Sequence, residues 1–188
     1  MEIVLQIGLV LSGGKSSRMG KDKSAMKVGK ATMLEHSINM LNSLNLDNVV
    51  VSGADFDIPD LFPNKGPVGG IYSAVQHLSL STGDIMLVIP NDMPLLRPDL
   101  LQRLIQQSFN HQCTFTYQNH PMPLSLFISE GILNRLQSLE SAAGMSIRHL
   151  IQADKVGELS VELQDVFSNV NTPQELENAV QNYKKMCP

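Results

Sequence analysis

The stretch LVLSGGKSSRMGKDK occupies residues 9–23 and changes character at a pair of glycines. Before the glycines, residues 3–11 are largely apolar, which is typical of a parallel strand buried on both faces. After them the chain becomes cationic: residues 15–30 carry six of the 14 Lys and Arg side chains and a single acid. The whole chain, by contrast, has a net charge of −4. The stretch therefore predicts a buried strand that ends in a concentrated positive loop.

Strands and helices alternate from this point onward. Further buried strands are predicted at 47–52 and 84–90, and helices at 32–44, 66–78 and 98–108. This alternation favours an α/β fold with a parallel sheet covered on both faces. The loops at 12–22, 53–66 and 90–97 then lie along the carboxyl edge of the sheet, which is where open α/β sheets bind ligands.

The second half of the chain is less regular. We expect paired strands at 113–117 and 122–128 around a QNHP turn, helices at 130–140 and 146–153, and a short strand at 158–162. The last helix begins in NTPQELE, with Thr172 as its N-cap and Glu175 completing a capping box. A chain of 188 residues without repeats or linkers is expected to form one domain.

Composition excludes several classes of protein. Aromatic residues make up 5% of the chain and tryptophan is absent, which, with the acidic balance, disfavours nucleic-acid binding. Two cysteines, Cys113 and Cys187, form neither a disulfide framework nor a zinc cluster. No apolar run approaches the ~20 residues that span a bilayer, and the first residues lack the features of a secretory leader. We expect a cytoplasmic protein that contacts neither nucleic acid nor membrane.

The positive loop has a functional and a neutral interpretation. Backbone N–H groups exposed by Gly13 and Gly14, together with the cations, suit a polyphosphate; alternatively, the charges are an ordinary solvated surface. The loop is not a P-loop, because Lys15 and Ser16 come one position late for that spacing. The glycine spacing does not match a dinucleotide-binding fingerprint either.

Asp92 is the candidate metal ligand. It follows a wholly apolar strand, so its carboxylate is expected at the strand end, facing the positive loop. Mg²⁺ favours one or two carboxylates together with phosphate oxygens. The alternative is an aspartate that caps a turn before Pro94.

Five blocks of sequence resemble the MobA-like nucleotidyltransferases. The first is L-x-G-G-x-S-x-R-M-G-x-D-K, matched at every fixed position between Leu11 and Lys23. The others are GPVGGI (66–71), NDMPLL (91–96), HPMPLSLF (120–127) and NVNTPQEL (169–176). They span nearly the whole chain in the family's order.

The resemblance implies a fold and a reaction. The fold is a three-layer α/β sandwich with a mostly parallel Rossmann-like sheet, of the nucleotide-diphospho-sugar-transferase type. Residues 1–110 would form the nucleotide-binding half and 111–188 the acceptor-binding half. The implied reaction transfers GMP from GTP to the phosphate of Mo-molybdopterin and releases pyrophosphate, with Mg²⁺, or Mn²⁺ in its place, as cofactor. Transient contact with other proteins of molybdenum cofactor synthesis is also implied.

The resemblance also implies roles for particular residues. Arg18, Lys23 and Asp92 would be catalytic, and Asp92 would hold the metal. Asn169 and Asn171 would lie near the phosphates and metal, although asparagines before a capped helix also serve ordinary turns. The nucleotide would be bound by Leu11, Ser12, Gly13, Gly14, Lys15, Lys23, Ser52, Asp60 and Asp92, where Ser12 and Ser52 stand at positions at which relatives often carry Ala and Asn.

Three alternatives remain open at the level of sequence. LSGG at 11–14 resembles the pattern of family members that use GTP, but a cytidylyltransferase of the same cofactor, or another sugar-phosphate or cofactor nucleotidyltransferase, would keep Lys23 and Asp92. A nucleotide-binding regulatory module without turnover would also retain the loop. The histidines show no metal-ligand spacing. The sequence assigns no role to His120, and Arg148 and His149 could face an anionic acceptor or simply solvent.

Overall fold

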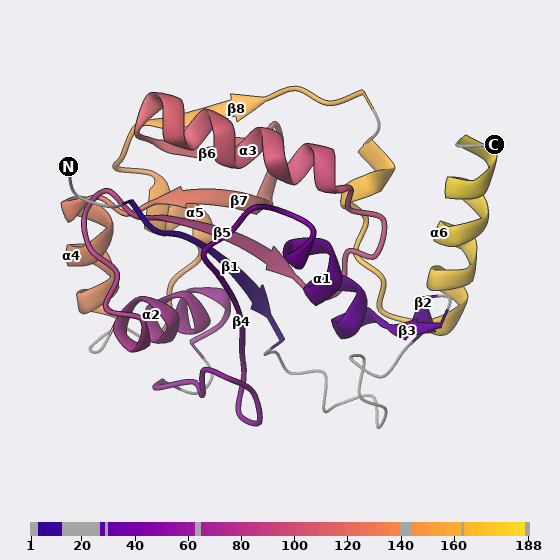
Figure 1. Cartoon of the computed structure of the whole chain (residues 1–188), viewed down its shortest axis with the longest axis horizontal. Helices are drawn as coiled ribbons and strands as arrows, with labels where there is room; N and C mark the ends of the chain where they lie inside the picture. Colours follow the sequence, from indigo (N-terminus) through magenta and orange to yellow (C-terminus); the bar gives the residue numbers. More distant parts are fainter. Residues whose placement is uncertain are drawn as a thin grey trace.

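A computed structural model describes residues 4–12, 27–28, 30–62, 65–139, 144–162 and 164–186 of the chain. Its main sheet has the strand order β4-β1-β5-β7-β6-β8 (Figure 1). In that order the strands are Asn48–Ser52, Gln6–Leu11, Ile85–Pro90, His120–Phe127, Thr114–Tyr117 and Val156–Leu159. Strands from both halves of the chain therefore build one sheet.

The first three strands run parallel, as predicted. β1 lies between β4 and β5, and its last residue, Leu11, pairs with Ser52 on one side and Pro90 on the other. The loops that follow all three strands consequently leave the sheet at the same edge. This register confirms that the 12–22, 53–66 and 90–97 loops begin side by side.

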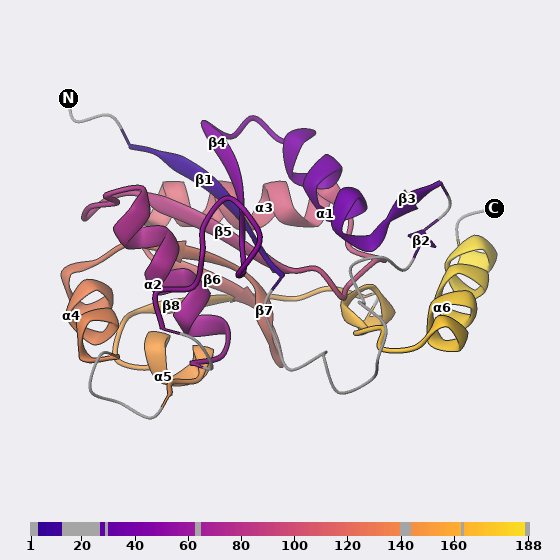
Figure 2. The same ribbon diagram turned by 90° about the horizontal axis from the view of Figure 1, so that it is seen from below.

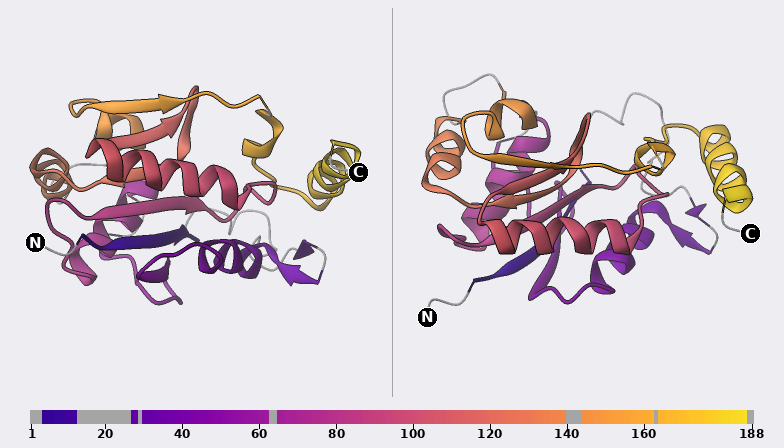
Figure 3. Two further views of the ribbon diagram at one scale, coloured as in Figure 1. Left: turned by 45° about the horizontal axis from the view of Figure 1, so that its top comes forward. Right: turned by 90° about the horizontal axis from the view of Figure 1, so that it is seen from above.

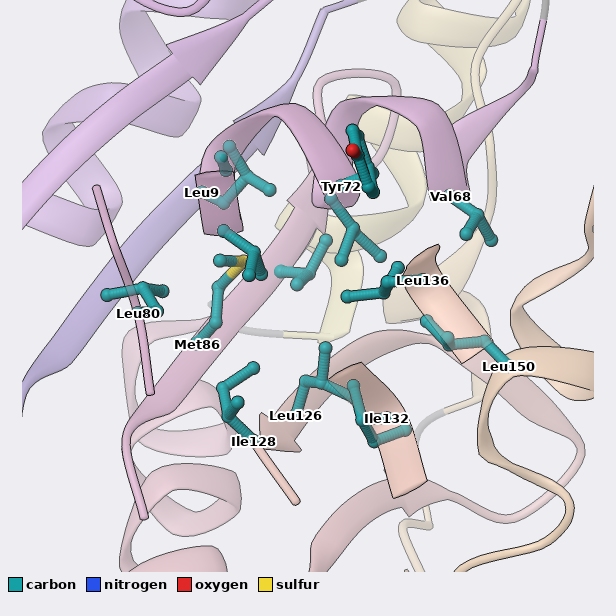
Figure 4. Packing of buried hydrophobic residues seen from close by; sticks show 14 of the residues in the cluster. Leu9, Val68, Tyr72, Leu80, Met86, Leu126, Ile128, Ile132, Leu136 and Leu150 are labelled. Carbon is teal, nitrogen blue, oxygen red and sulfur yellow. The ribbon is translucent and has the colours of Figure 1, made fainter. Parts of the chain in front are cut away.

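Helices cover both faces of the sheet, which confirms the three-layer fold (Figure 2). One face packs against α2 (Pro67–His77), α4 (Glu130–Ser138) and α5 (Ile147–Ile151), and the other against α1 (Met33–Asn42) and α3 (Pro98–His111). Alternation along β1 supplies both layers, because Leu9 packs into the first core and Val10 into the second. Figure 4 shows the first core, where Leu9 and Met86 of the sheet meet Tyr72 of α2 and Ile132 and Leu136 of α4.

The second half adds two antiparallel pairings to the parallel core. β7 runs antiparallel to β5 and to β6, and β6 pairs parallel with β8. The expected QNHP turn is shorter than predicted: His120 already pairs with Tyr117, and the turn consists of Gln118 and Asn119. Asn119 has a φ of 67°, a conformation that asparagine adopts more readily than most residues.

Several other element boundaries differ from the sequence-based expectation. The strand expected at 158–162 runs over Val156–Leu159, and α3 continues to His111 rather than ending at 108. The helix predicted from Thr32 begins at Met33, with Thr32 and Glu35 forming a full capping box. Along the part of the chain that is described, no helix is both long and apolar enough to cross a bilayer.

A small third cluster lies at one end of the molecule. There α6 (Pro173–Met186) stands beside the short strands β2 (Lys27–Val28) and β3 (Ala31–Thr32), as Figures 1 and 3 show. Met33, Val170 and Leu176 are its buried residues. The cluster thereby joins the chain just after the positive loop to the chain just before α6.

Candidate active site

Three strand ends are tied together at the carboxyl edge of the sheet. The N–H of Ser12 donates to the carbonyl of Ser52 (3.1 Å), and the N–H of Asn91 donates to the carbonyl of Leu11 (3.3 Å). The side-chain amide of Asn91 also donates to Ser12 Oγ (3.2 Å). The residues that begin the three loops are thus held in one small region, with Ser12 only half buried.

Helix α2 approaches these strand ends unusually closely. A Cβ atom on Gly70 would lie 2.6 Å from Ser52 Oγ and 2.8 Å from Leu11 Cδ2. Both distances are shorter than ordinary packing allows, so the helix could not lie here with a larger residue at this position. The glycine of the GPVGGI block therefore brings the first turns of α2 against Leu11 and Ser52, two of the predicted nucleotide-binding residues.

Asp92 begins the loop after β5, as the sequence indicates. Asp92 as a whole is half-buried, while its Oδ1 atom is buried. The loop is held from two sides: His36 Nε2 on α1 donates to the carbonyl of Pro94 (3.1 Å), and the N–H of Val170 donates to the carbonyl of Asp92 (2.7 Å). The carboxylate therefore stands on a fixed backbone rather than on a free loop.

The donor chemistry at this edge fits a hard divalent cation. Asp92 supplies a carboxylate, which together with phosphate oxygens is the ligand set that Mg²⁺ prefers. Among the described residues, no group of three or more His, Cys, Asp and Glu side chains comes together as a metal cluster. The described residues therefore do not form a metal site made of protein ligands alone. Asp92 instead suits a metal ion whose other ligands are phosphate oxygens.

The hydrogen bond to Asp92 brings the NVNTPQEL block to the same place. Val170 is buried, whereas Asn169 and Asn171 on either side of it are exposed. Such alternation is that of extended chain, so the two asparagines are directed away from Val170. The N–H of Asn171 donates to Glu175 Oε2 (2.6 Å), which ties it to the capping box at the start of α6.

Asp60 lies in the loop that folds back along β4. Ile58 bridges to Ser52, and the N–H of Leu61 donates to Ser73 Oγ of α2 (2.9 Å). Asp60 is half-buried, and burial raises the pKa of its carboxyl. The loop therefore carries Asp60 beside α2.

The structure brings several sequence-predicted residues to one edge: Leu11, Ser12, Ser52, Asp92, Asn169 and Asn171. Five others, Gly13, Gly14, Lys15, Arg18 and Lys23, lie outside the described residues. Sequence reasoning missed Asn91 and His36 as parts of this site. Asn91 stands at the same strand end as Asp92 and could have been found by the same argument. His36 carries no such signal, since its partner is a backbone carbonyl 58 residues away.

The fold and this edge define an α/β nucleotide-binding protein of the transferase type. The family model of the MobA-like NTP transferase domain matches residues 8–159. The chain belongs to the MobA-like NTP transferase family.

Relatives and solved structures agree with this assignment. The molybdenum cofactor guanylyltransferase of Xanthomonas euvesicatoria is 32% identical to the chain, over 89% of this chain and 90% of the relative. The crystal structure of molybdopterin-guanine dinucleotide biosynthesis protein A from Archaeoglobus fulgidus is 21% identical, with a TM-score of 0.73, and covers 96% of this chain and 100% of its own. A Mycobacterium tuberculosis protein in complex with manganese is 16% identical, with a TM-score of 0.64, over 96% of this chain and 100% of its own. The two structures show that the fold is shared.

Proposed function

We propose that the protein transfers GMP from GTP to the terminal phosphate of Mo-molybdopterin and releases pyrophosphate. The observation that carries the proposal is the bond from Val170 N–H to the Asp92 carbonyl (2.7 Å). It unites two of the family's sequence blocks at the strand edge where the positive loop begins. The 32% identity to a guanylyltransferase over about nine-tenths of both chains supports the specific reaction.

The reaction needs positioning more than acid–base chemistry. An oxygen of the acceptor phosphate forms a bond to the α-phosphorus of GTP, and the bond from that phosphorus to the bridging oxygen of the β-phosphate breaks. The acceptor is already an anion, so it needs no strong base. Bringing two anions together is the main obstacle, and fixed positive charge and orientation reduce it.

We assign the positive charge to the loop after β1. Arg18 and Lys23 would hold the triphosphate with help from Lys15, while Gly13 and Gly14 let the backbone approach it. Removing one such charge costs on the order of 10²–10³ in turnover. We expect that loss for Lys23→Ala, and no comparable loss for Lys30→Ala, whose exposed side chain lies in the turn between β2 and β3.

We assign the metal to Asp92, with Asn169 and Asn171 supporting it. A Mg²⁺ ion, or Mn²⁺ in its place, would offset the negative charge of the phosphates when bound. The chain's own contribution is the fixed placement of the Asp92 carboxylate by its two backbone anchors. The Mycobacterium tuberculosis relative crystallised with manganese supports a divalent cation in this fold.

The nucleoside would lie over the ends of β1 and β4. Leu11, Ser12 and Ser52 line that part of the edge, and Asp60 lies in the following loop, where a carboxylate could accept from base or ribose. The LSGG pattern at 11–14 supports guanine. Cytosine is the competing base, because the same strand ends would serve a cytidylyltransferase.

The acceptor would be bound by residues 111–188, while residues 1–110 bind the nucleotide. The pairing of β5 with β7 joins these halves edge to edge, which supports an acceptor bound beside the nucleotide rather than on a separate domain. Other proteins of molybdenum cofactor synthesis would then contact this half transiently when the acceptor is delivered. We assign the reaction to the cytoplasm, where nucleoside triphosphates are available.

A nucleotide titration tests the proposal. We would measure thermal unfolding with GTP, CTP, ATP and UTP, each with and without Mg²⁺. At 100 times its dissociation constant a ligand adds about 2.7 kcal/mol to the free energy of unfolding. We expect GTP with Mg²⁺ to stabilise most. A preference for CTP would assign the protein to the cytidylyl reaction, and no stabilisation by any nucleotide would contradict the proposal.

Turnover separates an enzyme from a binding module. We expect pyrophosphate release from GTP only when molybdopterin is added, and Asp92→Ala should abolish this Mg²⁺-dependent activity while leaving the fold intact. Asp99→Ala is the matched control, because Asp99 is exposed on α3 and paired with Arg97 (2.9 Å). GTP binding without pyrophosphate release would support a regulatory module instead.

A further inference from the structure

Phe167 packs against two rings that project from neighbouring strands. Its ring centroid lies 4.9 Å from that of Tyr117 on β6 and 4.6 Å from that of His120 on β7, with interplanar angles of 35° and 39°. Phe167 itself is buried and ends the short 3₁₀ helix Gln164–Phe167. We propose that His120 is a positioning residue that acts through Phe167 to hold Asn169 and Asn171 beside Asp92. This inference rests on the proposed function.

One of the two rings is firmly fixed. Tyr117 is completely buried, and its hydroxyl donates to the carbonyl of Leu100 on α3 (3.0 Å). The sheet and a helix thus hold the Tyr117 ring, and it presents a rigid surface to Phe167. This single contact does not fix Phe167 completely, because both offset-stacked and edge-to-face arrangements of two rings are favourable.

His120 restricts this freedom. It is the first residue of β7 and pairs directly with Tyr117, so the two side chains are cross-strand neighbours. Phe167 contacts both rings and is consequently fixed from two directions. His120 is half-buried, which suits an imidazole better than a fully apolar ring at the border between core and solvent.

Phe167 is close enough in the chain to affect the positions of Asn169 and Val170. Asn169 is two residues away, and two residues of extended chain span at most about 7 Å. Val170 follows at once, with its side chain in the third cluster and its N–H on the Asp92 carbonyl. A displacement of Phe167 would therefore weaken the Val170–Asp92 hydrogen bond and move Asn169.

A simpler interpretation is that His120 only closes the end of the hairpin. In that case its loss would lower stability without affecting residues 169–171 in particular. The two interpretations differ at one measurable atom, the backbone N–H of Val170. They also differ in whether another ring at position 120 can replace the imidazole.

The molecule contains a matched control. His111, at the end of α3, forms a second His–Phe pair with Phe115 (5.7 Å between centroids, 40° between planes). α3 starts at Pro98, shortly after the Asp92 loop, and His111 at its other end lies roughly 20 Å from Pro98 along the helix axis. His111→Ala thus removes the same type of contact far from the site.

The test compares His120→Ala, His120→Phe and His111→Ala with the unchanged chain. The first readout is the hydrogen-exchange rate of the Val170 amide, which NMR measures on the protein without nucleotide. Losing one aromatic contact should speed this exchange about two- to tenfold in His120→Ala. We expect no such change in His111→Ala and near-normal exchange in His120→Phe, which keeps a ring.

The second readout is turnover with GTP, Mg²⁺ and molybdopterin. Misplacing a group by about 1 Å can cost up to 10²-fold in rate. We expect kcat to fall roughly 10- to 100-fold in His120→Ala with a smaller change in KM for GTP, and to recover in His120→Phe. Normal Val170 exchange in His120→Ala, equal effects of His111→Ala, or failure of His120→Phe to restore kcat would each overturn the inference.

The two readouts separate this inference from the proposed function. If the unchanged chain neither binds GTP nor releases pyrophosphate, the proposed function fails. The exchange measurement uses the protein alone, so it still decides whether His120 holds the 169–171 segment.

Discussion

The backbone N–H of Val170 donates a 2.7 Å hydrogen bond to the carbonyl oxygen of Asp92. These residues are far apart in the chain: Asp92 lies near its middle, after the third strand of the parallel core, and Val170 lies before the last helix. The bond uses backbone atoms only, so it does not involve the Asp92 carboxylate or the side chains of Asn169 and Asn171. It makes two segments behave as one unit at the carboxyl edge of the sheet.

The second segment is held at three successive points. Phe167 packs on Tyr117 and His120, Val170 is buried in the third cluster, and Glu175 accepts from the backbone of the residues before α6. A backbone fixed in this way loses little further entropy when a ligand binds, so only the exposed side chains remain to be ordered. This fixed backbone is consistent with the binding role that we propose for Asn169 and Asn171.

Glu175 provides the first prediction. Its Oε2 accepts from the N–H of Asn171 (2.6 Å) and of Thr172 (3.1 Å). We expect Glu175→Ala to cost about 1 kcal/mol of stability, as a lost helix cap does, and roughly 2–4 °C in Tm. Because Asn171 loses its anchor, kcat should fall by about tenfold. Thermal unfolding and pyrophosphate release would measure the two effects.

Glu177→Ala is the control for charge. Glu177 is exposed on the same helix and its replacement removes the same negative charge. We expect it to leave kcat unchanged. Equal kcat values for the two variants would show that the Glu175 hydrogen bonds do not serve the reaction.

The close contact of α2 gives the second prediction. In Gly70→Ala the new methyl group would meet Ser52 Oγ at 2.6 Å and Leu11 Cδ2 at 2.8 Å. We expect the free energy of unfolding to fall by about 1–3 kcal/mol, as overpacking usually costs. The affinity for GTP should weaken too, since Leu11 and Ser52 must move. Urea denaturation and a GTP titration would detect both changes.

A second substitution should relieve part of this strain. Ser52→Ala removes the oxygen at 2.6 Å and leaves Ser52 Cβ at 3.4 Å. The double variant should therefore be more stable than the sum of the two separate changes in unfolding free energy predicts. Simple additivity would mean that Gly70→Ala acts elsewhere than on Ser52.

The parallel core could be predicted from the sequence because its signals are local. Strands such as 85–90 are apolar throughout, and the edge rule then brings Asp92 and Ser12 together without any structure. The start of the second hairpin strand differs from the prediction for the opposite reason. Pro121 argues locally against a strand, whereas an irregular register at Thr116 and Tyr117 lets β7 begin at His120 instead of 122.

The parts of the site that the sequence could not predict are contacts between distant residues. His36 with Pro94, Val170 with Asp92, and His120 with Phe167 all depend on how the elements pack. None of these pairs has a characteristic spacing. Sequence motifs predict which segments form the candidate site, and tertiary packing determines how rigidly these segments are held.

Asp60 supplies a prediction about pH. Burial raises the pKa of its carboxyl, so the folded chain binds this proton more tightly than the unfolded chain. The resulting stability is complete below the unfolded pKa and is lost as the pH rises through the folded pKa. We therefore expect Asp60→Asn to be more stable than the unchanged chain at pH 7, and the difference to shrink as the pH falls toward about 4.

The same change should weaken GTP binding if Asp60 contacts the nucleotide, which would be a trade of stability for function. Asp55→Asn is the control, because Asp55 is exposed in the same loop. We expect no pH-dependent gain in that variant. Equal pH profiles for Asp55→Asn and Asp60→Asn would refute the role of burial.

Tyr117 should control stability in alkali. Burial raises the pKa of its phenol to about 12, while the unfolded chain titrates near 10. The folded state keeps its proton where the unfolded state loses it, so ionisation favours unfolding between pH 10 and 12 by roughly 2–3 kcal/mol in all. Absorbance at 295 nm should show one of the three tyrosines titrating near the top of this range.

Tyr117→Phe isolates this effect. At pH 7 the variant loses the hydrogen bond to Leu100 and should be less stable by about 1 kcal/mol. Since phenylalanine cannot ionise, its disadvantage should shrink above pH 10 and reverse before pH 12, as urea denaturation at each pH would show. A constant difference from pH 7 to 12 would mean that the phenol ionises as easily in the folded as in the unfolded chain. The ring that supports Phe167 would then be more accessible to water than its complete burial implies.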